Sequence, residues 1–298
     1  MSFLVIGEAL VDIVIQPGGD RREHPGGSPL NVAVGLARLQ NPTELIARMG
    51  HDEPGELLRR HLDGSGVALD PACIDDLPTA TAAAQLDAGG HATYHFDLQW
   101  ILPEVPARQG IQCVHIGSIG AFLEPGATGT VALAASLRDS ATVSFDPNIR
   151  TEFTGEPQTA RKHVESIVAM SDVVKVSDQD LAWLIPGADP ATVAADWLSL
   201  GPALVVVTRG GSDALAVAQS GPITVPAEPV EVVDTVGAGD AFTTGLLDAL
   251  GRAGLLGQRD LLRGIDGHAL RGALEFAGHV AAITCSRAGA NPPWKSEL

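Results

Sequence analysis

The chain of 298 residues is poor in cysteine and shows no leader segment. Its three cysteines, Cys73, Cys113 and Cys285, are widely spaced and form no C-x-x-C pattern. This spacing indicates neither a zinc site nor a disulfide framework, and is typical of a reducing cytoplasm. The first residues, MSFLVIGEALVDIVI, carry no basic leader, and Glu8 and Asp12 interrupt the apolar run. We therefore expect neither a signal peptide nor a membrane span, and a cytoplasmic location.

Basic residues are also scarce, with 19 Lys and Arg against 36 Asp and Glu, a formal net charge of −17. Nucleic acids and anionic membranes attract proteins through a basic surface. We therefore expect neither as a partner. An acidic chain can still bind an anionic small molecule where backbone amides or a few local cations offset its field.

Several common nucleotide-binding and catalytic motifs are missing. The sequence has no G-x-x-x-x-G-K-[ST], no G-x-G-x-x-G after its first apolar run, no G-x-S-x-G and no H-E-x-x-H. These absences exclude a P-loop and argue against an α/β-hydrolase and a zinc protease. The missing dinucleotide fingerprint also weakens the case for a dehydrogenase built on a doubly wound sheet.

Apolar runs without alternation recur along the chain and are separated by helical stretches. Such runs are typical of strands that are covered on both faces, and hence of a parallel sheet with crossover helices. We therefore predict an α/β fold. The expected strands lie in 3–7, 112–118, 142–148, 172–177 and 203–211, and the expected helices include 28–40, 127–140 and 160–170.

One segment, residues 81–100, instead alternates apolar and polar side chains, with Tyr94 and Phe96 on the same face. The pair Gly89-Gly90 between its halves predicts a hairpin turn. A one-sided ribbon inside an α/β protein is typical of a flap. Segment 12–27 is expected to add further strands to it, and its exposed aromatic face is also compatible with a dimer surface.

The stretch DTVGAGDAF, which begins at residue 234, places small residues before an amphipathic helix. Gly237, Ala238 and Gly239 leave backbone N–H groups open to an anion at the positive end of the helix dipole. The carboxylate of Asp240 would repel that anion. This cost makes sense if the carboxylate acts as a general base, which takes a proton from the attacking hydroxyl during phosphoryl transfer. The alternative is that Asp240 only caps the helix. Spacing alone leaves both open.

A second glycine-rich stretch, GGSPLNVAVGLARLQ, begins at residue 26. Gly26 and Gly27 permit close approach of a ligand, and Ser28 is suited to capping the helix that follows. Asn31, one turn into that helix, offers both a donor and an acceptor to a polyol. It is equally compatible with a surface position in a first helical turn.

Together, GGSPLNVAVGLARLQ and DTVGAGDAF resemble the two signatures of the ribokinase-like (PfkB) sugar kinase family, in the same order and at opposite ends of the chain. The resemblance extends from GEALVD to SRAGANPPW. It implies an α/β sandwich around a mostly parallel sheet, with a small antiparallel β lid formed by segments 12–27 and 81–100 in a single domain, 1–298. It also implies a carbohydrate kinase that uses ATP, Mg²⁺ and K⁺. The exposed aromatic face of the lid leaves a homodimer through the lid as one option.

Carried over residue by residue, the resemblance makes Asp240 the general base. The N–H groups of Gly237, Ala238 and Gly239 then form the anion hole for the transferred phosphoryl group. The guanidinium of Arg150 would either pair with a substrate carboxylate or contact phosphate. The residues that are implied to contact the sugar are Asp12, Gly26, Gly27, Asn31, Tyr94, Phe96 and Arg150.

The same resemblance implies a nucleotide site and two cation sites. Asp180 would hold magnesium through water, while Asp234 and the carbonyl of Val236 would share a potassium site. Ser177 and Asp180 stand where the broad family has Asn-x-x-Glu, and Gly278 stands where some members have Asn. The residues that are implied to lie at the nucleotide are Lys175, Ser177, Thr208, Gly210 and Gly278.

Four motifs, GEALVD, GGSPLN, FDPNIR and KVSDQD, resemble the fructokinase-like branch and predict fructose as the substrate. Lys175 in the last motif is either a phosphate contact or a strand-end surface lysine. A 2-keto-3-deoxygluconate kinase remains the alternative enzyme, because Arg150 suits an acid. A sensing protein on the same fold is the alternative of another class, but it would have no use for a base beside an anion hole.

Overall fold

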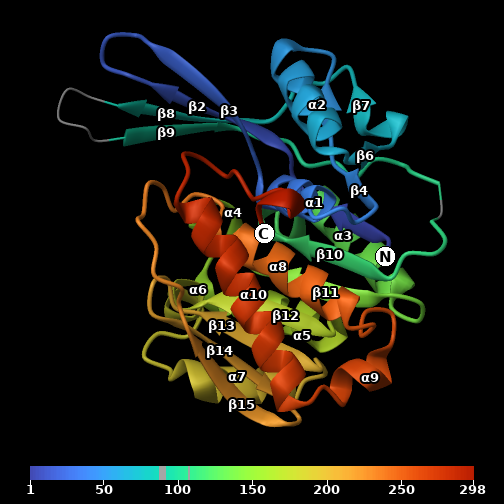
Figure 1. Cartoon of the computed structure of the whole chain (residues 1–298). Helices are drawn as coiled ribbons and strands as arrows, with labels where there is room; N and C mark the ends of the chain where they lie inside the picture. Colours follow the sequence, from blue (N-terminus) through green and yellow to red (C-terminus); the bar gives the residue numbers. More distant parts are fainter. Residues whose placement is uncertain (87–91, 107) are drawn as a thin grey trace.

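The computed structural model describes residues 1–86, 92–106 and 108–298, and it confirms the predicted α/β fold. A nine-stranded sheet with the order β15-β14-β13-β12-β11-β10-β1-β4-β6 lies between two layers of helices (Figure 1). Strands β13 to β6 in this order are parallel, and β14 and β15 add an antiparallel edge. The strands are β1 (Phe3–Ile6), β4 (Thr43–Ile46), β6 (Ala68–Leu69), β10 (Cys113–Gly117), β11 (Thr142–Asp146), β12 (Val173–Ser177), β13 (Leu204–Thr208), β14 (Asp213–Ala218) and β15 (Gly221–Pro226).

Both faces of this sheet are covered, which explains the continuous apolar runs of the sequence. In β1, Phe3 and Val5 pack into the core on one face, whereas Leu4 and Ile6 pack into the core on the other. A strand buried on both faces has no position for polar alternation. The first face is covered by α1 (Ser28–Arg38), α2 (Glu53–Ser65), α8 (Ala238–Arg252), α9 (Arg259–Arg263) and α10 (Gly267–Cys285), and the second by α3 (Gly126–Leu137), α5 (Pro157–Met170), α6 (Asp178–Leu184) and α7 (Pro190–Leu198).

A second, four-stranded sheet projects beyond the main sheet at the top of Figure 1, where segments 12–27 and 81–100 were expected to form a lid. The two hairpins are antiparallel as predicted, but the inner strands β2 and β8 pair in parallel, so the sheet as a whole is mixed. The reason is that these two strands come from separate parts of the chain and are not joined by a turn. The predicted turn at Gly89-Gly90 lies outside the described residues. The strands are β2 (Leu10–Ile15), β3 (Arg21–Gly26), β8 (Thr81–Leu86) and β9 (Ala92–Asp97).

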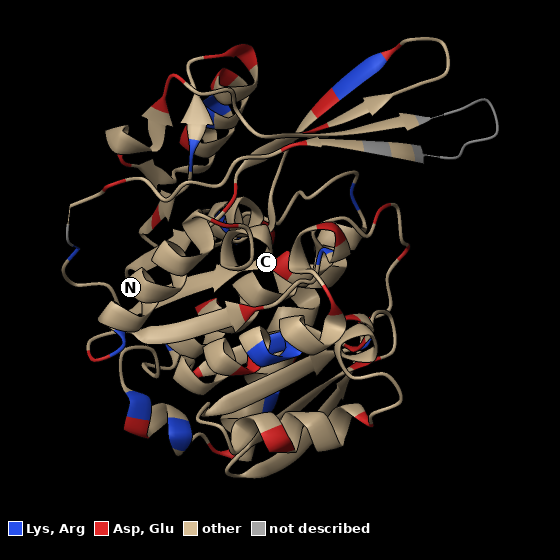
Figure 2. Cartoon of the chain, turned by 180° about the vertical axis from the view of Figure 1, so that it is seen from behind, with Lys and Arg blue, Asp and Glu red and all other residues tan. Residues whose placement is uncertain are grey.

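Smaller elements lie between the main ones along the chain. A two-stranded sheet pairs β5 with β7, and the single turn α4 follows β11. Within the described residues, no helix is both long and apolar enough to cross a membrane. Acidic residues, red in Figure 2, occur on many elements, whereas basic residues form short, separate segments. The bounds are β5 (Met49–Gly50), β7 (Ile74–Asp75) and α4 (Thr151–Thr154).

Candidate active site

A polar cavity of about 150 Å³ lies at the carboxyl ends of the parallel strands, between the lid and the amino-terminal turns of α1 and α8. Ligands of open α/β sheets bind at this edge, because the loops that leave neighbouring parallel strands converge there. The cavity unites segments that are more than 200 residues apart in sequence. It is lined by Glu8, Leu10, Asp12, Gly27, Ser28, Asn31, Ala82, Phe96, Ser118, Ile119, Arg150, Phe153, Val236, Gly237 and Asp240.

Asp240 is a buried acid of this cavity, with 6% of its surface exposed. One carboxylate oxygen, Oδ1, accepts a hydrogen bond from Ser28 Oγ at 2.6 Å, and Oδ2 accepts one from Asn31 Nδ2 at 2.8 Å. The N-cap of α8 is Gly237, and no side chain caps this helix. The capping alternative for Asp240 is therefore wrong. Burial raises the pKa of Asp240, while the hydrogen bonds from Ser28 and Asn31 act in the opposite direction.

The small residues before Asp240 are required by their surroundings. Gly237 has a φ of 75°, which favours glycine, and a Cβ there would lie 2.6 Å from the Cβ of Ala290. A Cβ on Gly239 would lie 2.9 Å from the ammonium nitrogen of Lys175. The first turn of α8 therefore presents backbone N–H groups with a cation beside them, which is a favourable arrangement for an anion. The Ala238 N–H donates to the Thr235 carbonyl at 3.2 Å in this structure, so it must change partner to bind an anion.

Lys175 is neither a surface lysine nor at a strand end, because it is buried with 5% exposure in the middle of β12. Its Nζ lies 3.0 Å from Oδ2 of Asp146, the last residue of β11. Burial lowers the pKa of Lys175, but the carboxylate of Asp146, together with those of Asp180 and Asp240, raises it overall, so that the side chain stays charged. The other oxygen of Asp146 is buried and has no hydrogen-bond partner among the described residues.

Asp180 lies close to this ion pair and is held in place by its own helix. Its Oδ2 accepts a hydrogen bond from Ser177 Oγ at 2.7 Å in the capping box of α6, and its Oδ1 accepts one from the Ile149 N–H at 2.9 Å. Burial and the negative charge of Asp146 both raise the pKa of Asp180. Two carboxylates in mutual repulsion beside a candidate phosphate site fit a hard divalent cation, which prefers oxygen ligands and retains several waters.

The predicted sugar residues of the first glycine-rich stretch meet at the base of the lid. A Cβ on Gly26 would overlap the carboxylate of Asp12 on the neighbouring strand. Gly27 has a φ of 103°, and a Cβ there would lie 2.6 Å from the carbonyl oxygen of Glu8. Both glycines therefore allow close packing of backbone and acid around the cavity. Burial raises the pKa of Asp12.

The lid and the loop after β11 close the other side of the cavity. Phe96 packs edge-to-face on Phe153, with ring centroids 5.3 Å apart. Tyr94 lies on the same strand as Phe96, but its side chain is outside the described part of the structure. Arg150 donates a hydrogen bond to Asn148 Oδ1 at 2.8 Å, and its positive charge lowers the pKa values of Glu8 and Asp12 against the larger effect of burial.

Two functional candidates, Glu8 and Asp146, were not predicted from the sequence. Glu8 is 3% exposed and accepts hydrogen bonds from the N–H groups of Ser28 at 3.3 Å and Gly120 at 2.7 Å. Burial raises the pKa of Glu8 to about 7. The available signal was a single acid at the end of an otherwise apolar strand, which occurs in both FLVIGE and TVSFD. An acid there is costly to bury unless it is used.

The remaining nucleotide candidates lie outside this cavity. Ser177 and Thr208 are paired residues at the ends of β12 and β13, so two of the predicted positions share one sheet edge. Gly210 follows with a φ of 53°, and Gly278 lies on α10 with open space beside its Cα. The structure thus brings Ser177 and Thr208 together, and places Gly278 on a separate helix.

Asp234 joins two loops beside α8. Its Oδ1 accepts a hydrogen bond from the Val236 N–H at 3.0 Å, and its Oδ2 accepts one from the Gly289 N–H at 2.8 Å. These backbone donors lower the pKa of Asp234. The carboxylate thereby connects the GAGD loop to the SRAGA loop. This arrangement places a carboxylate between the two loops that were predicted to form the cation site.

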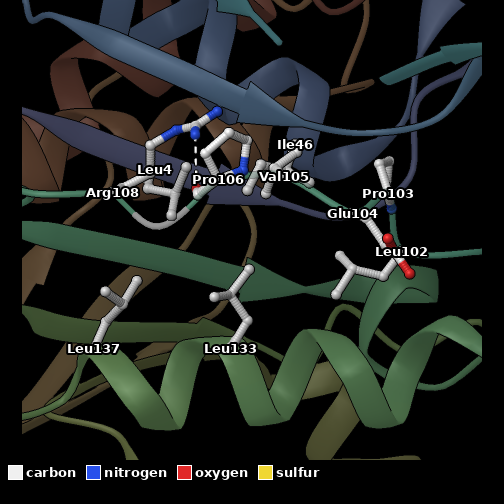
Figure 3. Close-up of a pocket in the computed structure, with 10 residues that line it drawn as sticks. All are labelled: Leu4, Ile46, Leu102, Pro103, Glu104, Val105, Pro106, Arg108, Leu133 and Leu137. Atoms are coloured by element: carbon white, nitrogen blue, oxygen red, sulfur yellow. Dashed lines mark hydrogen bonds between the residues drawn. The ribbon is translucent and has the colours of Figure 1, made fainter. Parts of the chain in front are cut away.

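A larger cavity of about 320 Å³ lies under the segment that leaves the lid (Figure 3). Its walls are mostly apolar side chains of β1, β4, α3 and residues 102–106. The guanidinium of Arg108 lies at one end, where it pairs with Glu44 and Asp70. Because this cation is already paired with two acids and the walls are mostly apolar, size alone does not make this cavity a candidate active site.

Comparisons with known proteins all point to carbohydrate kinases. The sequence pattern described as pfkB family carbohydrate kinase matches residues 2–297. A fructokinase from Klebsiella pneumoniae is 36% identical over 261 residues, which are 84% of this chain and 85% of that protein.

Two solved structures share the fold over nearly the full length. A double-mutant fructokinase from Vibrio cholerae O395, bound to fructose, ADP and potassium ion, has a TM-score of 0.79 and 27% identity, covering 97% of this chain and 93% of that one. An aminoimidazole riboside kinase from Salmonella enterica, complexed with aminoimidazole riboside and an ATP analog, has a TM-score of 0.80 and 26% identity, covering 97% and 95%.

Proposed function

Because this chain belongs to the pfkB family of carbohydrate kinases, we propose that it is a fructokinase, which transfers the γ-phosphoryl group of ATP to a hydroxyl of fructose. One observation carries the mechanistic part of this proposal. Asp240 is a buried carboxylate that lies in a sugar-sized polar cavity, beside a helix amino terminus and the ammonium of Lys175. In this proposal residues 1–298 act as one kinase domain, and the sheet of β2, β3, β8 and β9 closes over bound sugar.

The proposed reaction uses Asp240 as the general base. The sugar hydroxyl gives its proton to the Asp240 carboxylate as its oxygen forms a bond to the γ-phosphorus, and the bond from that phosphorus to the bridging oxygen of ADP breaks. Negative charge spreads over the equatorial oxygens of the transferred group. The N–H groups of Gly237, Ala238 and Gly239, together with the Lys175 ammonium, stabilise that charge.

Two cations are part of the proposal. Magnesium, when bound with ATP, neutralises charge on the β- and γ-phosphate oxygens. Asp180 would hold it through water, and the unpartnered oxygen of Asp146 faces the same group of charges. Asp234 and the carbonyl of Val236 would hold potassium. Turnover should stop when Mg²⁺ is chelated and should fall when K⁺ is replaced by a bulky organic cation; rates unchanged in either case would contradict the corresponding role.

The charge of the cavity favours a neutral sugar over a sugar acid. Three acids, Glu8, Asp12 and Asp240, line the cavity, and Arg150 is the one basic residue among the described residues that line it. Because burial raises the pKa of Glu8 to about 7, the comparison that matters is Asp12 and Asp240 against Arg150, and a substrate carboxylate would still meet more negative than positive charge. The position of Arg150 at the cavity still makes a 2-keto-3-deoxygluconate kinase the second candidate, since a guanidinium binds a carboxylate in a fork.

The experiment that tests the substrate is a panel of ATP turnover by the purified chain with fructose, ribose, aminoimidazole riboside and 2-keto-3-deoxygluconate. We expect the highest kcat/KM for fructose. A higher value for the sugar acid would assign the role of Arg150 to substrate recognition. A higher value for the riboside would overturn the fructokinase proposal, and turnover that no sugar stimulates would favour a sensing protein.

A further inference from the structure

The side chain of Ser28 has a use that differs from the predicted helix cap. The N-cap of α1 is Gly27, and no side chain caps this helix. The Ser28 hydroxyl instead leaves its own helix and donates to Oδ1 of Asp240 at 2.6 Å. Both residues are buried, with 7% and 6% of their surfaces exposed. A hydrogen bond from a buried hydroxyl to a buried carboxylate is of the strong, charge-assisted kind.

The backbone of Ser28 is itself fixed from three directions. Its N–H donates to Glu8 Oε1 at 3.3 Å, and the other oxygen of Glu8 accepts the Gly120 N–H at 2.7 Å. Gly27 before it packs directly on the carbonyl of Glu8. Pro29 after it fills the space beside Gly7, where a Cβ would overlap its ring. The hydroxyl of Ser28 is therefore presented by rigid backbone, which is what holding a reactive group requires.

The two partners of the Asp240 carboxylate differ in what else they are able to do. Asn31 carries a carboxamide with two donors and an acceptor, and it lines the cavity as a predicted sugar contact. A sugar hydroxyl that approaches Oδ2 must therefore compete with the Asn31 amide. Ser28 has a single proton to donate, and that proton already points to Oδ1.

We propose that Ser28 is the positioning residue of the base: its hydroxyl holds Oδ1 of Asp240 throughout turnover, so that Oδ2, which Asn31 contacts in this structure, takes the proton of the sugar. This inference rests on the proposed role of Asp240 as general base. The proposal assigns different roles to the two residues that donate to Asp240. Ser28 sets the orientation and ionisation of the base, and Asn31 turns from the base to the sugar as the sugar binds.

The electrostatics of the site support this division. Burial raises the pKa of Asp240, the nearby carboxylate of Asp146 adds to the effect, and the ammonium of Lys175 and the hydrogen bonds from Ser28 and Asn31 oppose it. Removing the Ser28 hydroxyl should therefore raise the pKa of Asp240 further, so that a smaller fraction of the base is ionised at a given pH. The acidic limb of the kcat/KM profile should move to higher pH.

The test compares Ser28→Ala with Thr244→Ala, measuring kcat, KM for each substrate, the pH profile and the melting temperature. Thr244 lies on α8 and is a matched control, because its buried hydroxyl donates to the Val32 carbonyl at 3.4 Å in the same helix pair. Ser28→Ala should lower kcat about 10- to 100-fold, the effect expected for a hydrogen bond to a charged group, and move the acidic limb upward. Thr244→Ala should keep kcat within about twofold and leave the acidic limb in place.

Two further variants complete the test. Ser28→Thr keeps the hydroxyl, so its acidic limb should remain where the wild-type limb lies, even if packing lowers its stability. Asn31→Ala should act mainly on KM for the sugar. If Ser28→Ala keeps wild-type kcat and an unmoved acidic limb while Asp240→Asn is inactive, the role of Ser28 is wrong and the proposed base stands. If Asp240→Asn is itself active, the proposed base fails first.

Discussion

Of two cavities in the described part of the chain, the smaller one carries more of the groups that catalysis needs. The larger, about 320 Å³, lies between apolar side chains, and the guanidinium of Arg108 at its edge is neutralised by two acids (Figure 3). The smaller, about 150 Å³, gathers acids, amides and hydroxyls from the lid, α1, α8 and the loops at the carboxyl edge of the sheet. Buried polar groups are costly, so their concentration in one place indicates the site more reliably than volume does.

The acids of the molecule show the same contrast. At the smaller cavity, burial raises the pKa values of Glu8, Asp12 and Asp240. At the exposed amino termini of α7 and α10, backbone N–H groups lower the pKa values of the capping residues Asp189 and Asp266. A structural acid is thus surrounded by donors that stabilise its charge, whereas the acids of the cavity are held closer to proton uptake at neutral pH.

The largest expected effect is that of Asp240→Asn. Asn keeps the size and can still accept from Ser28, but it cannot take the sugar proton. We expect kcat to fall roughly 10²- to 10⁴-fold, with KM for ATP unchanged or lower, because a negative charge beside the phosphates is removed. Asp12→Asn, a change of another acid of the same cavity, should instead act mainly on KM for the sugar. Retention of more than about a tenth of wild-type kcat by Asp240→Asn would contradict the base.

Lys175→Met should have the next largest effect, on both activity and stability. It removes a cation beside the anion hole, so kcat should fall about 10²-fold, as when one donor to a developing anion is lost. It also leaves Asp146 buried and unpaired, which should lower the free energy of unfolding by about 3–5 kcal/mol. The double variant Lys175→Met with Asp146→Asn separates the effect on activity from the effect on stability. It should recover most of the stability and none of the activity; recovered activity would show that Lys175 is only structural.

Glu8→Gln should change how stability depends on pH. The folded protein holds a proton on Glu8 up to a pKa of about 7, well above the ordinary value of 4.5, so the wild type should lose stability as pH rises through this interval. Gln cannot ionise and removes this dependence. The difference in free energy of unfolding between the two proteins should change by about 3 kcal/mol between pH 4.5 and 7, and urea titrations at several pH values measure it. Parallel curves would contradict the burial of an uncharged Glu8.

The smallest expected effect on activity is in the larger cavity. Leu133 is a half-buried residue of α3 whose side chain forms part of the apolar wall of this cavity. Leu133→Ala removes most of that side chain, so the free energy of unfolding should fall by about 1–2 kcal/mol. Because the two cavities share no lining residue among those the structure describes, kcat and both KM values should stay within about twofold of wild type. A substantial loss of kcat would show that the two cavities are coupled, and the contrast drawn between them would fail.

Much of the architecture could be predicted from the sequence, because it follows from local patterns. Continuous apolar runs predicted the parallel sheet, and the alternating segment 81–100 predicted the lid. The parallel pairing of β2 and β8 could not be predicted, because it depends on which separate segments meet. In the site, the small residues before Asp240 were informative because their glycines are required by sterics.

The parts of the site that escaped prediction are those that depend on distance in space. The hydrogen bond from Ser28 to Asp240 spans 212 positions, and the pair of Lys175 with Asp146 joins the middle of β12 to the end of the neighbouring strand β11. A single sequence contains no record of either proximity. Glu8 was visible only as an interruption of an apolar run, and its importance follows from burial that the sequence does not state.

The central claim is that the sugar is phosphorylated in the smaller cavity with Asp240 as the base. The most direct measurement is a crystal structure of the wild-type chain with fructose and a non-hydrolysable ATP analogue. The account predicts fructose in the smaller cavity, with the hydroxyl that faces the γ-phosphate about 2.6–3.2 Å from Oδ2 of Asp240 and with Ser28 still bound to Oδ1. Fructose bound elsewhere, or an attacking hydroxyl that contacts a different acid such as Asp12, would contradict it.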